Sequence, residues 1–336
     1  MYNNTMKKEI NHIAIVRLSA LGDIVNASVV LQYIKQFYPN IKIDWITEEV
    51  FAPLLDKHPL INDVITLNLK KFKKDKSLTL LQEQIQKLKE TPEYDLVIDM
   101  QGLIKSSLVA KFAGEKRHGF DKHSTRESLA AFFYTSTSHI AYEENVIKRN
   151  CFVVSDPLEF EISSDMLLTK QRVFPFTKTF TLSKEKKNIA LVIGASWESK
   201  IYPIELLADV CNGLKEQFYI IWGSEAEKKM AHKLSSLTPF TQLAPKMTLD
   251  ELVSYISSMD LVIGNDTGPT HMAWAQNIPS ITLFGPTNTR MIYETTQNIG
   301  IKSPSKVDIL KINKNDFSIK EIPPQIVIEK AKELLR

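Results

Sequence analysis

Residues 264–271 read GNDTGPTH and follow directly on the apolar run 261–263. The chain contains only 11 glycines in 336 residues, yet two of them lie here beside an Asn, an Asp and two Thr. A strand that passes into a helix through such residues presents backbone N–H groups and the positive end of a helix dipole to an anion. Asp266 would repel a bare phosphate, so we expect it to fix the loop or to accept hydrogen bonds from hydroxyl groups. The stretch therefore predicts an anion site.

Other glycines occupy the same kind of position. Five of them lie at or just beyond the end of an apolar, β-rich run: Gly102, Gly194, Gly223, Gly264 and Gly285. Ligands of open parallel sheets bind at the carboxyl ends of the strands. The glycines therefore predict two such edges, one in each half of the chain.

Several common nucleotide motifs are missing. There is no GxxxxGK[ST], so ATP binding through a P-loop is not expected. RLSALGD stands where a GxGxxG would follow the first strand, which argues against a standard NAD or FAD site. HExxH and GxSxG are also absent. Because no DxD pair follows a strand, we expect neither a metal nor another cofactor.

Composition describes an ordinary soluble protein, with 43% hydrophobic and 24% charged residues. The net charge of +3 is too small to indicate nucleic acid. Two cysteines without metal-ligand spacing, a polar N-terminus and no apolar run of about 18 residues predict a cytoplasmic protein that meets a membrane only from the side. The basic stretch 105–126 reads most simply as a solvated face, although it would also suit an acidic substrate or an anionic membrane.

Short β-rich runs alternate with helical patterns, as in parallel βαβ units. Strands are expected at 12–18, 41–46, 64–67, 96–100, 189–193, 219–222, 261–263 and 281–284, and helices at 24–37, at 77–89, from 203, from 248 and over the tail. The Lys-rich run 70–76 reads as a loop, and 155–187 as an extended, partly strand-like connection. The pattern and the length predict an α/β fold with two Rossmann-like αβα domains, 1–175 and 176–336, facing a central cleft.

Five stretches in order resemble the ADP-heptose:lipopolysaccharide heptosyltransferases, and within them the type I enzymes. They are RLSALGDIVNA at 17–27, DLVIDMQGLIKSS at 95–107, GFDKHSTRESLAAFFY at 119–134, GASWESKIYP at 194–203 and GNDTGPTHMAWA at 264–275 with the following TLFGPTNT. The resemblance covers nearly the whole chain. It implies a GT-B fold, with acceptor binding in the first domain, donor binding in the second and a last helix that sometimes packs back on the first.

The implied reaction moves heptose from ADP-heptose to the Kdo residue of Kdo-lipid A with inversion, in the synthesis of the lipopolysaccharide inner core. Such a displacement needs a base near the attacking hydroxyl and stabilisation of the leaving diphosphate. The family motif makes Asp23 the base, although an Asp at this position also suits a helix N-cap. Lys200 is the cation for the diphosphate. The chain has Ala195 where relatives often carry a second Thr.

The resemblance also implies which residues bind the donor and which bind the acceptor. The donor side comprises Ser196, Lys200, Glu225, Asp266, Thr267, Gly268 and His271, with Glu225 on the ribose hydroxyls. The acceptor side comprises Ser19, Gly22, Lys105 and Arg126, with Arg117, His118 and Lys122 in the same stretches. A helix-capping box is also expected from Ser124 to Glu127. The partners implied are ADP-heptose, Kdo-lipid A and the cytoplasmic face of the inner membrane, which Phe132, Phe133 and Tyr134 would touch unless they pack in the core.

Alternatives stay open at this point. The enzyme could be heptosyltransferase II or another ADP-heptose transferase with a different acceptor. The same two-domain architecture also supports nucleotide-sugar 2-epimerases, which need no acceptor, and non-catalytic nucleotide-sugar-binding proteins. Asp23 and Lys200 argue against the last of these.

Overall fold

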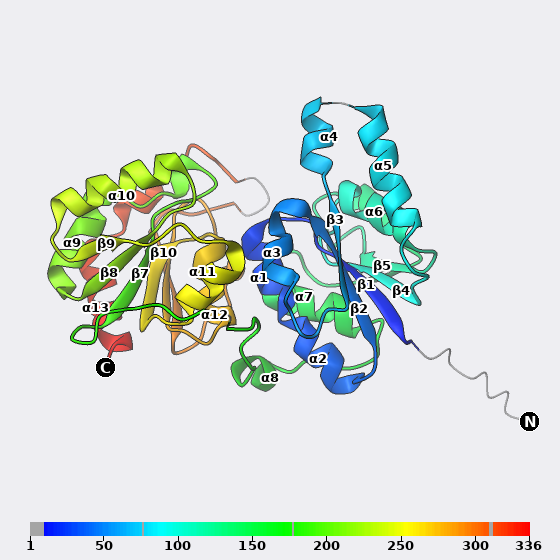
Figure 1. The fold of residues 1–336 in the computed structure, drawn as a ribbon, viewed down its shortest axis with the longest axis horizontal. Helices are drawn as coiled ribbons and strands as arrows, with labels where there is room; N and C mark the ends of the chain where they lie inside the picture. Colours follow the sequence, from blue (N-terminus) through cyan, green and yellow to red (C-terminus); the bar gives the residue numbers. More distant parts are fainter. Residues whose placement is uncertain (1–9, 76, 177, 309–311) are drawn as a thin grey trace, which may run out of the picture. The chain divides into compact units, whose positions relative to one another are not determined.

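The computed structural model describes residues 10–336 except 76, 177 and 309–311. It forms two compact units, each built on one sheet with helices beside it (Figure 1). The first unit contains the residues up to 19 together with 30–142 and 150–162, and the second contains 20–29, 143–149 and 163–336. A short segment from the N-terminal part of the chain, residues 20–29, therefore folds with the second unit.

The sheet of the first unit has six strands in the order β3-β2-β1-β4-β5-β6, all parallel. These strands are β1 His12–Val16, β2 Lys42–Glu48, β3 Asp63–Leu67, β4 Leu96–Asp99, β5 Arg117–Phe120 and β6 Ser136–Ser138. Its helices are α2 Val30–Phe37, α3 Ala52–Leu55, α4 Leu69–Asp75, α5 Leu78–Lys89 and α6 Ile104–Ala113, with the 3-10 helix η2 Ser128–Phe133. Helix α7, Val146–Ser155, begins in the second unit and ends in the first.

The sheet of the second unit repeats this plan in the order β12-β11-β10-β7-β8-β9, again parallel. Its strands are β7 Asn188–Val192, β8 Gln217–Ile221, β9 Thr241–Leu243, β10 Leu261–Asn265, β11 Ser280–Phe284 and β12 Asn298–Lys302. Its helices are α1 Leu21–Ser28, α8 Ser164–Leu168, α9 Ile204–Leu214, α10 Glu225–Leu237, α11 Leu249–Ile256, α12 Gly268–Ala275 and α13 Pro324–Leu334. The prediction of an α/β fold with two Rossmann-like sheets is confirmed.

Strand order reverses beside the first strand of each sheet. β1 pairs with β2 on one side and β4 on the other, and β7 pairs with β8 and β10. The connections therefore leave in opposite directions, and in open α/β sheets ligands bind outside the carboxyl ends of the strands at such a point. In the second unit this switch point lies between β7 and β10, where GNDTGPTH begins.

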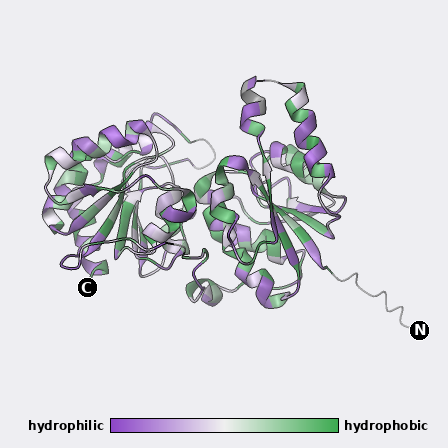
Figure 2. Cartoon of the chain, in the orientation of Figure 1, coloured by the Kyte–Doolittle hydropathy of each residue, from purple (hydrophilic) through white to green (hydrophobic). Residues whose placement is uncertain are grey.

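Burial explains which strands could be predicted from the sequence. Strand β10 is buried along its whole length, and β1 is buried after its first residue. A strand that is covered on both faces has a continuous apolar sequence. Figure 2 shows the inner strands of both sheets as hydrophobic. The strands that the sequence analysis did not predict, β5, β6, β9 and β12, contain polar residues or are only three residues long.

Three predictions about local structure were wrong. The helix expected over 24–37 is divided at Val29 into α1 and α2, which belong to different units. The Lys-rich run 70–76 is largely helix α4, since Lys is a good helix former. The connection 155–187 contains the short helix α8 and, in its described residues, no strand.

The last helix, α13, packs on α9 within the second unit. Its buried residues Val327, Ile328 and Ala331 belong to the same apolar core as Leu207, Val210 and the strands of the second sheet. Gly213 on α9 allows this close approach, because a Cβ there would lie 2.5 Å from the Ile328 Cδ1. The apolar face of α13 is thereby covered.

The segment before the second sheet is fixed to α12 by a buried lysine. The Lys170 ammonium donates to the carbonyl of Ala275 (3.2 Å) and to the side chain of Asn277, and it lies 4.6 Å from the Trp274 ring centroid. Burial lowers the pKa of Lys170 to about 7. The charged form is therefore costly in the folded state.

This shift gives the stability of the protein a pH dependence. Above pH 7 the unfolded chain binds a proton at Lys170 that the folded chain has lost, so the free energy of unfolding should rise with pH, by up to about 1.4 kcal/mol per pH unit. We expect urea unfolding of Lys170→Met to lack this rise between pH 7 and 9. The exposed Lys178, on the same segment, provides the control, and Lys178→Met should follow the wild type. Parallel curves for wild type and Lys170→Met would contradict the prediction.

Candidate functional site

The loop from β10 to α12 is held by close packing and local hydrogen bonds. Thr267 is the N-cap residue of α12, Pro269 lies in the first turn, and the Thr270 hydroxyl donates to the Asn265 carbonyl at 2.7 Å. A Cβ on Gly264 would lie 2.5 Å from the Val192 Cβ, so glycine is required where β10 meets β7. The backbone thus enters α12 in one fixed conformation.

Asn265 links the loop to the neighbouring strand. Its side-chain amide donates to the Ile193 carbonyl at 2.9 Å, and its oxygen accepts from the Tyr202 N–H at 3.0 Å. The amide also reaches the Gly194 carbonyl at 3.3 Å. One buried side chain therefore fixes the ends of β7 and β10 and the loop that contains Lys200.

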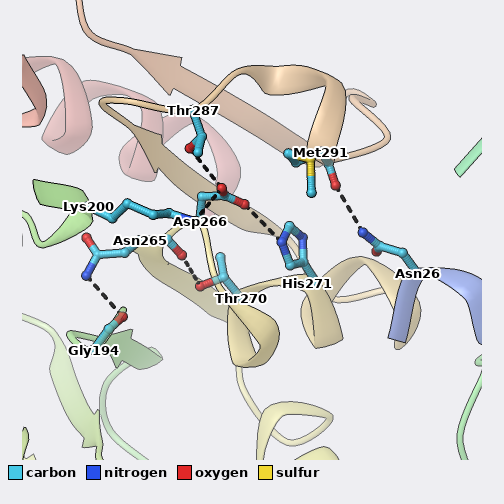
Figure 3. A network of polar contacts seen from close by, with 9 residues as sticks. All are labelled: Asn26, Gly194, Lys200, Asn265, Asp266, Thr270, His271, Thr287 and Met291. Carbon is cyan, nitrogen blue, oxygen red and sulfur yellow. Dashed lines mark hydrogen bonds and ion pairs between the residues drawn. The ribbon is translucent and has the colours of Figure 1, made fainter. Parts of the chain in front are cut away.

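Asp266 is the centre of the polar contacts in Figure 3. Its Oδ2 accepts from the Lys200 Nζ at 2.7 Å and from the Thr287 hydroxyl at 2.8 Å, and its Oδ1 lies 3.0 Å from the His271 Nε2. All four residues are largely buried: the Lys200 side chain is 11% exposed and those of Asp266 and His271 are 3% and 4%. We call Lys200, Asp266, His271 and Thr287 the Asp266 cluster.

Opposing effects act on the Asp266 carboxyl. Burial alone would raise its pKa, but the Lys200 charge and the hydrogen bond and charge of His271 outweigh burial and hold the pKa well below its usual range. The carboxylate is therefore ionised and can only accept hydrogen bonds. His271 must then present a hydrogen on Nε2.

The second ring nitrogen of His271, Nδ1, is buried and has no hydrogen-bond partner among the described residues. Buried polar atoms are usually paired, so an orphaned one beside an anion-type loop suggests a ligand contact. His271 also touches α1, because a Cβ on Gly22 would lie 2.6 Å from the His271 Cδ2. Likewise, a Cβ on Gly268 would lie 2.5 Å from the Leu21 Cγ. Helices α1 and α12 thus pack through two glycines.

This packing brings the first turn of α1, which contains Asp23, to the Asp266 cluster within one unit. Asp23 is partly buried, and its Oδ2 accepts from the Ala20 N–H at 3.1 Å. Ala20 is the N-cap residue of α1 and Asp23 is the third helical residue, so the expectation of an Asp23 N-cap was wrong, although the Asp23 side chain satisfies the N–H of the N-cap residue. This bond to a backbone donor does not decide whether Asp23 also acts as a base.

The loop after β11 is hydrogen-bonded to α1 within the second unit. The Asn26 amide on α1 donates to the Met291 carbonyl at 3.0 Å, and the Asn145 amide donates to the Ile292 carbonyl at 2.6 Å. Thr287 comes from this loop. The sequence analysis did not single out Thr287 or Asn26, because only the folded chain brings them to Asp266 and α1.

The loop after β7 carries the other predicted donor residues. Ser196 is exposed there, and Lys200 ends the 3-10 helix η3, Glu198–Lys200. The Lys200 ammonium lies 5.6 Å from the centroid of the Trp197 ring, and that of Lys314 lies 5.0 Å from it. Lys200 is therefore paired with a carboxylate, and its ammonium, like that of Lys314, lies near the Trp197 ring.

Two glutamates follow β8, and they lie in different environments. Glu225, predicted for the ribose hydroxyls, is the first residue of α10 and is exposed. Glu227 instead accepts from the Gly223 N–H at 2.6 Å and the Ser224 N–H at 3.0 Å. Its Oε1 would lie 1.9 Å from a Cβ on Gly194, so it reaches the end of β7.

The predicted acceptor residues Lys105 and Arg126 lie in the first unit, and so does Ser19. The Lys105 ammonium pairs with the buried Glu48 at 3.2 Å, and Arg126 is exposed. Gly22 lies in the second unit on α1. The structure therefore does not gather these four residues within one unit.

Two residues of the same stretches, Arg117 and His118, make contacts inside the first unit. Arg117 donates to the carbonyls of Phe133 (2.7 Å) and Gly114 (3.0 Å). His118 is buried between the hydroxyls of Ser136 and Ser138, and burial lowers its pKa to about 4.

The capping box expected from Ser124 to Glu127 does not form. The Glu127 carboxylate instead accepts from the Ile104 N–H at 2.8 Å, and the Ser124 hydroxyl accepts from the Ile140 N–H at 2.8 Å. Both side chains therefore join segments that are distant in the sequence, and a local pattern does not reveal such contacts.

Two kinds of feature are absent from the described residues. No group of three or more His, Cys, Asp or Glu side chains is arranged to hold a metal ion. In the same part of the chain, no helix is long and apolar enough to cross a membrane.

Breaking the Asp266 cluster should destabilise the fold. Asp266→Asn leaves the Lys200 charge without its buried partner, and we expect a loss of roughly 2–4 kcal/mol in urea unfolding. Adding Lys200→Met to Asp266→Asn should recover part of that loss, because the unpaired charge is removed. The exposed pair Lys233–Glu205 gives the control, and Glu205→Gln should change stability by less than about 0.5 kcal/mol. Equal effects of Asp266→Asn and Glu205→Gln would refute the buried pairing.

The chain is similar to known proteins over most of its length. Residues 82–309 match the model of glycosyltransferase family 9 (heptosyltransferase). The chain is 38% identical to lipopolysaccharide heptosyltransferase 1 of Campylobacter coli over 96% of this chain and 98% of that protein. It is 26% identical to the Escherichia coli K12 protein of the same name, over 90% and 96% of the two chains.

A solved structure shares the fold. The Escherichia coli heptosyltransferase WaaC with ADP-2-deoxy-2-fluoro heptose matches with a TM-score of 0.78 at 23% identity, covering 96% of this chain and 99% of that one. The predicted GT-B type of fold is thereby confirmed. Since the family model spans more than half of the chain and the Campylobacter coli relative is similar over nearly the whole length, the chain belongs to the heptosyltransferases of glycosyltransferase family 9.

Proposed function

We propose that this protein is the type I enzyme, which transfers L-glycero-D-manno-heptose from ADP-heptose to the Kdo residue of Kdo-lipid A. The observation that carries the proposal is the Asp266 cluster at the switch point of a family 9 chain. The name of the Campylobacter coli relative supports type I, as do several further relatives called lipopolysaccharide heptosyltransferase 1. A nucleotide-sugar 2-epimerase lacks this support.

In the proposed reaction, the acceptor hydroxyl attacks the anomeric carbon of the heptose while the bond from that carbon to the ADP oxygen breaks. A base takes the hydroxyl proton, and the leaving diphosphate takes the bonding electrons. Stabilising that developing charge and removing that proton are the two tasks of the protein. Inversion follows because the hydroxyl attacks from the side opposite to ADP.

The donor diphosphate binds at the start of α12. The N–H groups of Thr267 and Gly268 and the helix dipole suit an anion there, and Lys200 supplies a charge. His271 contributes its orphaned Nδ1. Asp266 orients Lys200 and His271 and accepts from sugar hydroxyls. Ser196 adds a hydroxyl near the phosphates, and Glu225 accepts from the ribose.

Asp23 is the base. It lies in the first turn of α1, which packs on α12 through Gly22 and Gly268, so base and donor loop belong to one body. On the acceptor side, Ser19 and Gly22 shape the loop before α1. Lys105 and Arg126 bind the anionic groups of the Kdo region, for which an arginine fork is well suited.

The same proposal assigns acceptor binding to residues 1–175 and donor binding to 176–336. It places the enzyme in the cytoplasm, on the inner face of the inner membrane, where a lipid-anchored acceptor is reached from the side. It needs no metal or other cofactor and no nucleic acid.

The first test separates the capping role of Asp23 from its role as base. Asp23→Asn keeps an oxygen for the Ala20 N–H, so stability should change little, while kcat should fall by about 10²–10⁴-fold. Asp23→Ala should lose activity and also about 1 kcal/mol of stability. The assay follows mass gain on Kdo-lipid A and ADP release, with and without acceptor.

Other results would redirect the assignment. Heptose added only to an acceptor that already carries one heptose would indicate the type II enzyme. ADP-heptose altered without acceptor would indicate an epimerase. Full activity of Asp23→Asn would exclude Asp23 as the base.

A second test concerns Lys200. Lys200→Met should weaken ADP binding, measured by calorimetry, by about 10–100-fold, because a charge-assisted contact is lost. Since the Asp266 carboxylate, no longer neutralised by Lys200, would add repulsion, Lys200→Met/Asp266→Asn should bind ADP better than Lys200→Met alone. Lys233→Met, from an exposed ion pair, is the control and should bind normally. ADP affinity unchanged in Lys200→Met would remove Lys200 from the donor site.

A further inference from the structure

A second lysine lies at the loop that contains Lys200. The Lys314 ammonium is 5.0 Å from the centroid of the Trp197 ring, and the Lys200 ammonium is 5.6 Å from the same centroid. The two ammonium nitrogens can therefore be at most about 11 Å apart, a distance that one diphosphate with a charge-assisted hydrogen bond of about 2.8 Å at each end can bridge. Lys314 belongs to the second unit, like every residue of the Asp266 cluster.

The backbone around Lys314 is held in a turn. The Asp316 N–H donates to the Asn313 carbonyl at 3.2 Å, and the Asn315 N–H donates to the Asn313 side-chain oxygen at 3.0 Å. The Asp316 carboxylate then accepts from the first N–H of the 3-10 helix η5, Ser318–Glu321, at 2.9 Å. Lys314 therefore stands in an ordered turn that leads into η5.

Helix η5 is in turn attached to the two loops that complete the Asp266 cluster. One contact reaches the loop after β7, where the buried Tyr202 donates from its hydroxyl to the Ile322 carbonyl at 2.7 Å. Another reaches the loop after β11, where a Cβ on Gly285 would lie 2.6 Å from the Ile319 Cβ. The segment that contains Lys314 is thereby fixed to the framework of the cluster within the second unit.

The charge balance of the Asp266 cluster leaves a task for a further cation. Asp266 is ionised and pairs with Lys200, so their charges largely cancel. A nucleotide diphosphate sugar carries a negative charge on each phosphate, and loss of the sugar adds another. Lys314 forms no ion pair with a carboxylate among the described residues, so its charge is not compensated. Lys314 can therefore supply the net positive charge that the buried pair lacks.

The contact with Trp197 leaves the Lys314 ammonium available to a ligand. Lys314 is exposed, and a cation–π contact at an exposed site is weak, whereas a charge-assisted hydrogen bond to a phosphate is strong. The ammonium can therefore exchange the ring for an anion. Because the ring already keeps this long side chain near the site, fewer conformations are lost when the anion binds.

We propose that Lys314 binds the donor diphosphate as a second cation in addition to Lys200, and that the Trp197 ring holds it at the site before the donor arrives. This inference rests on the proposed function for the identity of the donor. Lys314 lies outside the stretches that resemble the heptosyltransferases, so it adds a residue to the donor side. Because the leaving ADP carries more negative charge than ADP-heptose, Lys314 contributes to kcat as well as to binding.

The test compares ADP with adenosine, which lacks the phosphates. Lys314→Met should weaken ADP binding, measured by calorimetry, by roughly three- to tenfold, because one charge-assisted contact is lost. Adenosine should bind Lys314→Met and wild type equally. Lys314→Arg keeps the charge and should restore most of the ADP affinity. Lys320→Met, at an exposed lysine on η5 that lies 4.6 Å from the Phe317 ring centroid, is the matched control and should bind ADP like wild type.

Transfer of heptose to Kdo-lipid A provides a second readout. The kcat of Lys314→Met should fall several-fold, because the charge on the leaving ADP is less well stabilised. The KM for Kdo-lipid A should stay at the wild-type value, since Lys314 does not belong to the acceptor side.

Unchanged ADP affinity and kcat in Lys314→Met would overturn the proposal. Equal weakening of ADP and adenosine would also overturn it, because Lys314 would then act on the nucleoside or on the fold, and so would equal weakening of ADP by Lys320→Met. If wild type transfers heptose to Kdo-lipid A and Lys314→Met binds ADP like wild type, the Lys314 proposal fails alone. If ADP binding depends on Lys314 but wild type transfers no heptose to Kdo-lipid A, the proposed function fails alone.

Discussion

The buried carboxylate of Asp266 imposes the constraint on which the candidate site depends. A carboxylate removed from water must be compensated by cations and hydrogen bonds, and here Lys200, His271 and Thr287 provide them from three separate segments. Each of those segments is thereby fixed relative to the start of α12. The same contacts place two cationic or donor side chains at the N-terminus of a helix, where an anion is favoured. The contacts of Asp266 therefore both fix the loops in place and set the charge distribution of the site.

Close packing through glycine extends this order to α1. Gly22 and Gly268 let α1 and α12 approach until the His271 ring and the Leu21 side chain fill the space that a Cβ would need. Asp23 on α1 therefore belongs with the donor loop, although its place in the sequence lies next to β1 of the first unit. The proposed base and the proposed leaving-group site have a fixed separation as a result. The proposed acceptor residues Lys105 and Arg126 belong to the first unit.

The sequence predicts whatever depends on burial or on local chemistry. The strands at the centre of both sheets are apolar runs, and GNDTGPTH carries its own strand-to-helix signal, so both were predicted. Edge strands such as β6 and β9 are short or polar and gave no such pattern. The division of 24–37 at Val29 could not be predicted, because the change of unit, and not a helix breaker, ends α1 there. Partners distant in the sequence, such as Thr287 for Asp266 and Ile104 for Glu127, were missed because only the folded chain brings them together.

The pairing of Lys200 with Asp266 also explains how a buried cation can remain available to bind an anionic substrate. A lysine that waited unpaired at 11% exposure would pay a desolvation cost before any donor arrived, whereas the carboxylate offsets that cost. When the diphosphate of the proposed donor enters, Lys200 exchanges one anionic partner for another or bridges both. Asp266 keeps Thr287 and His271 in either case, so it is not left unpaired. Because the loops are already ordered, donor binding does not have to offset the free-energy cost of ordering them.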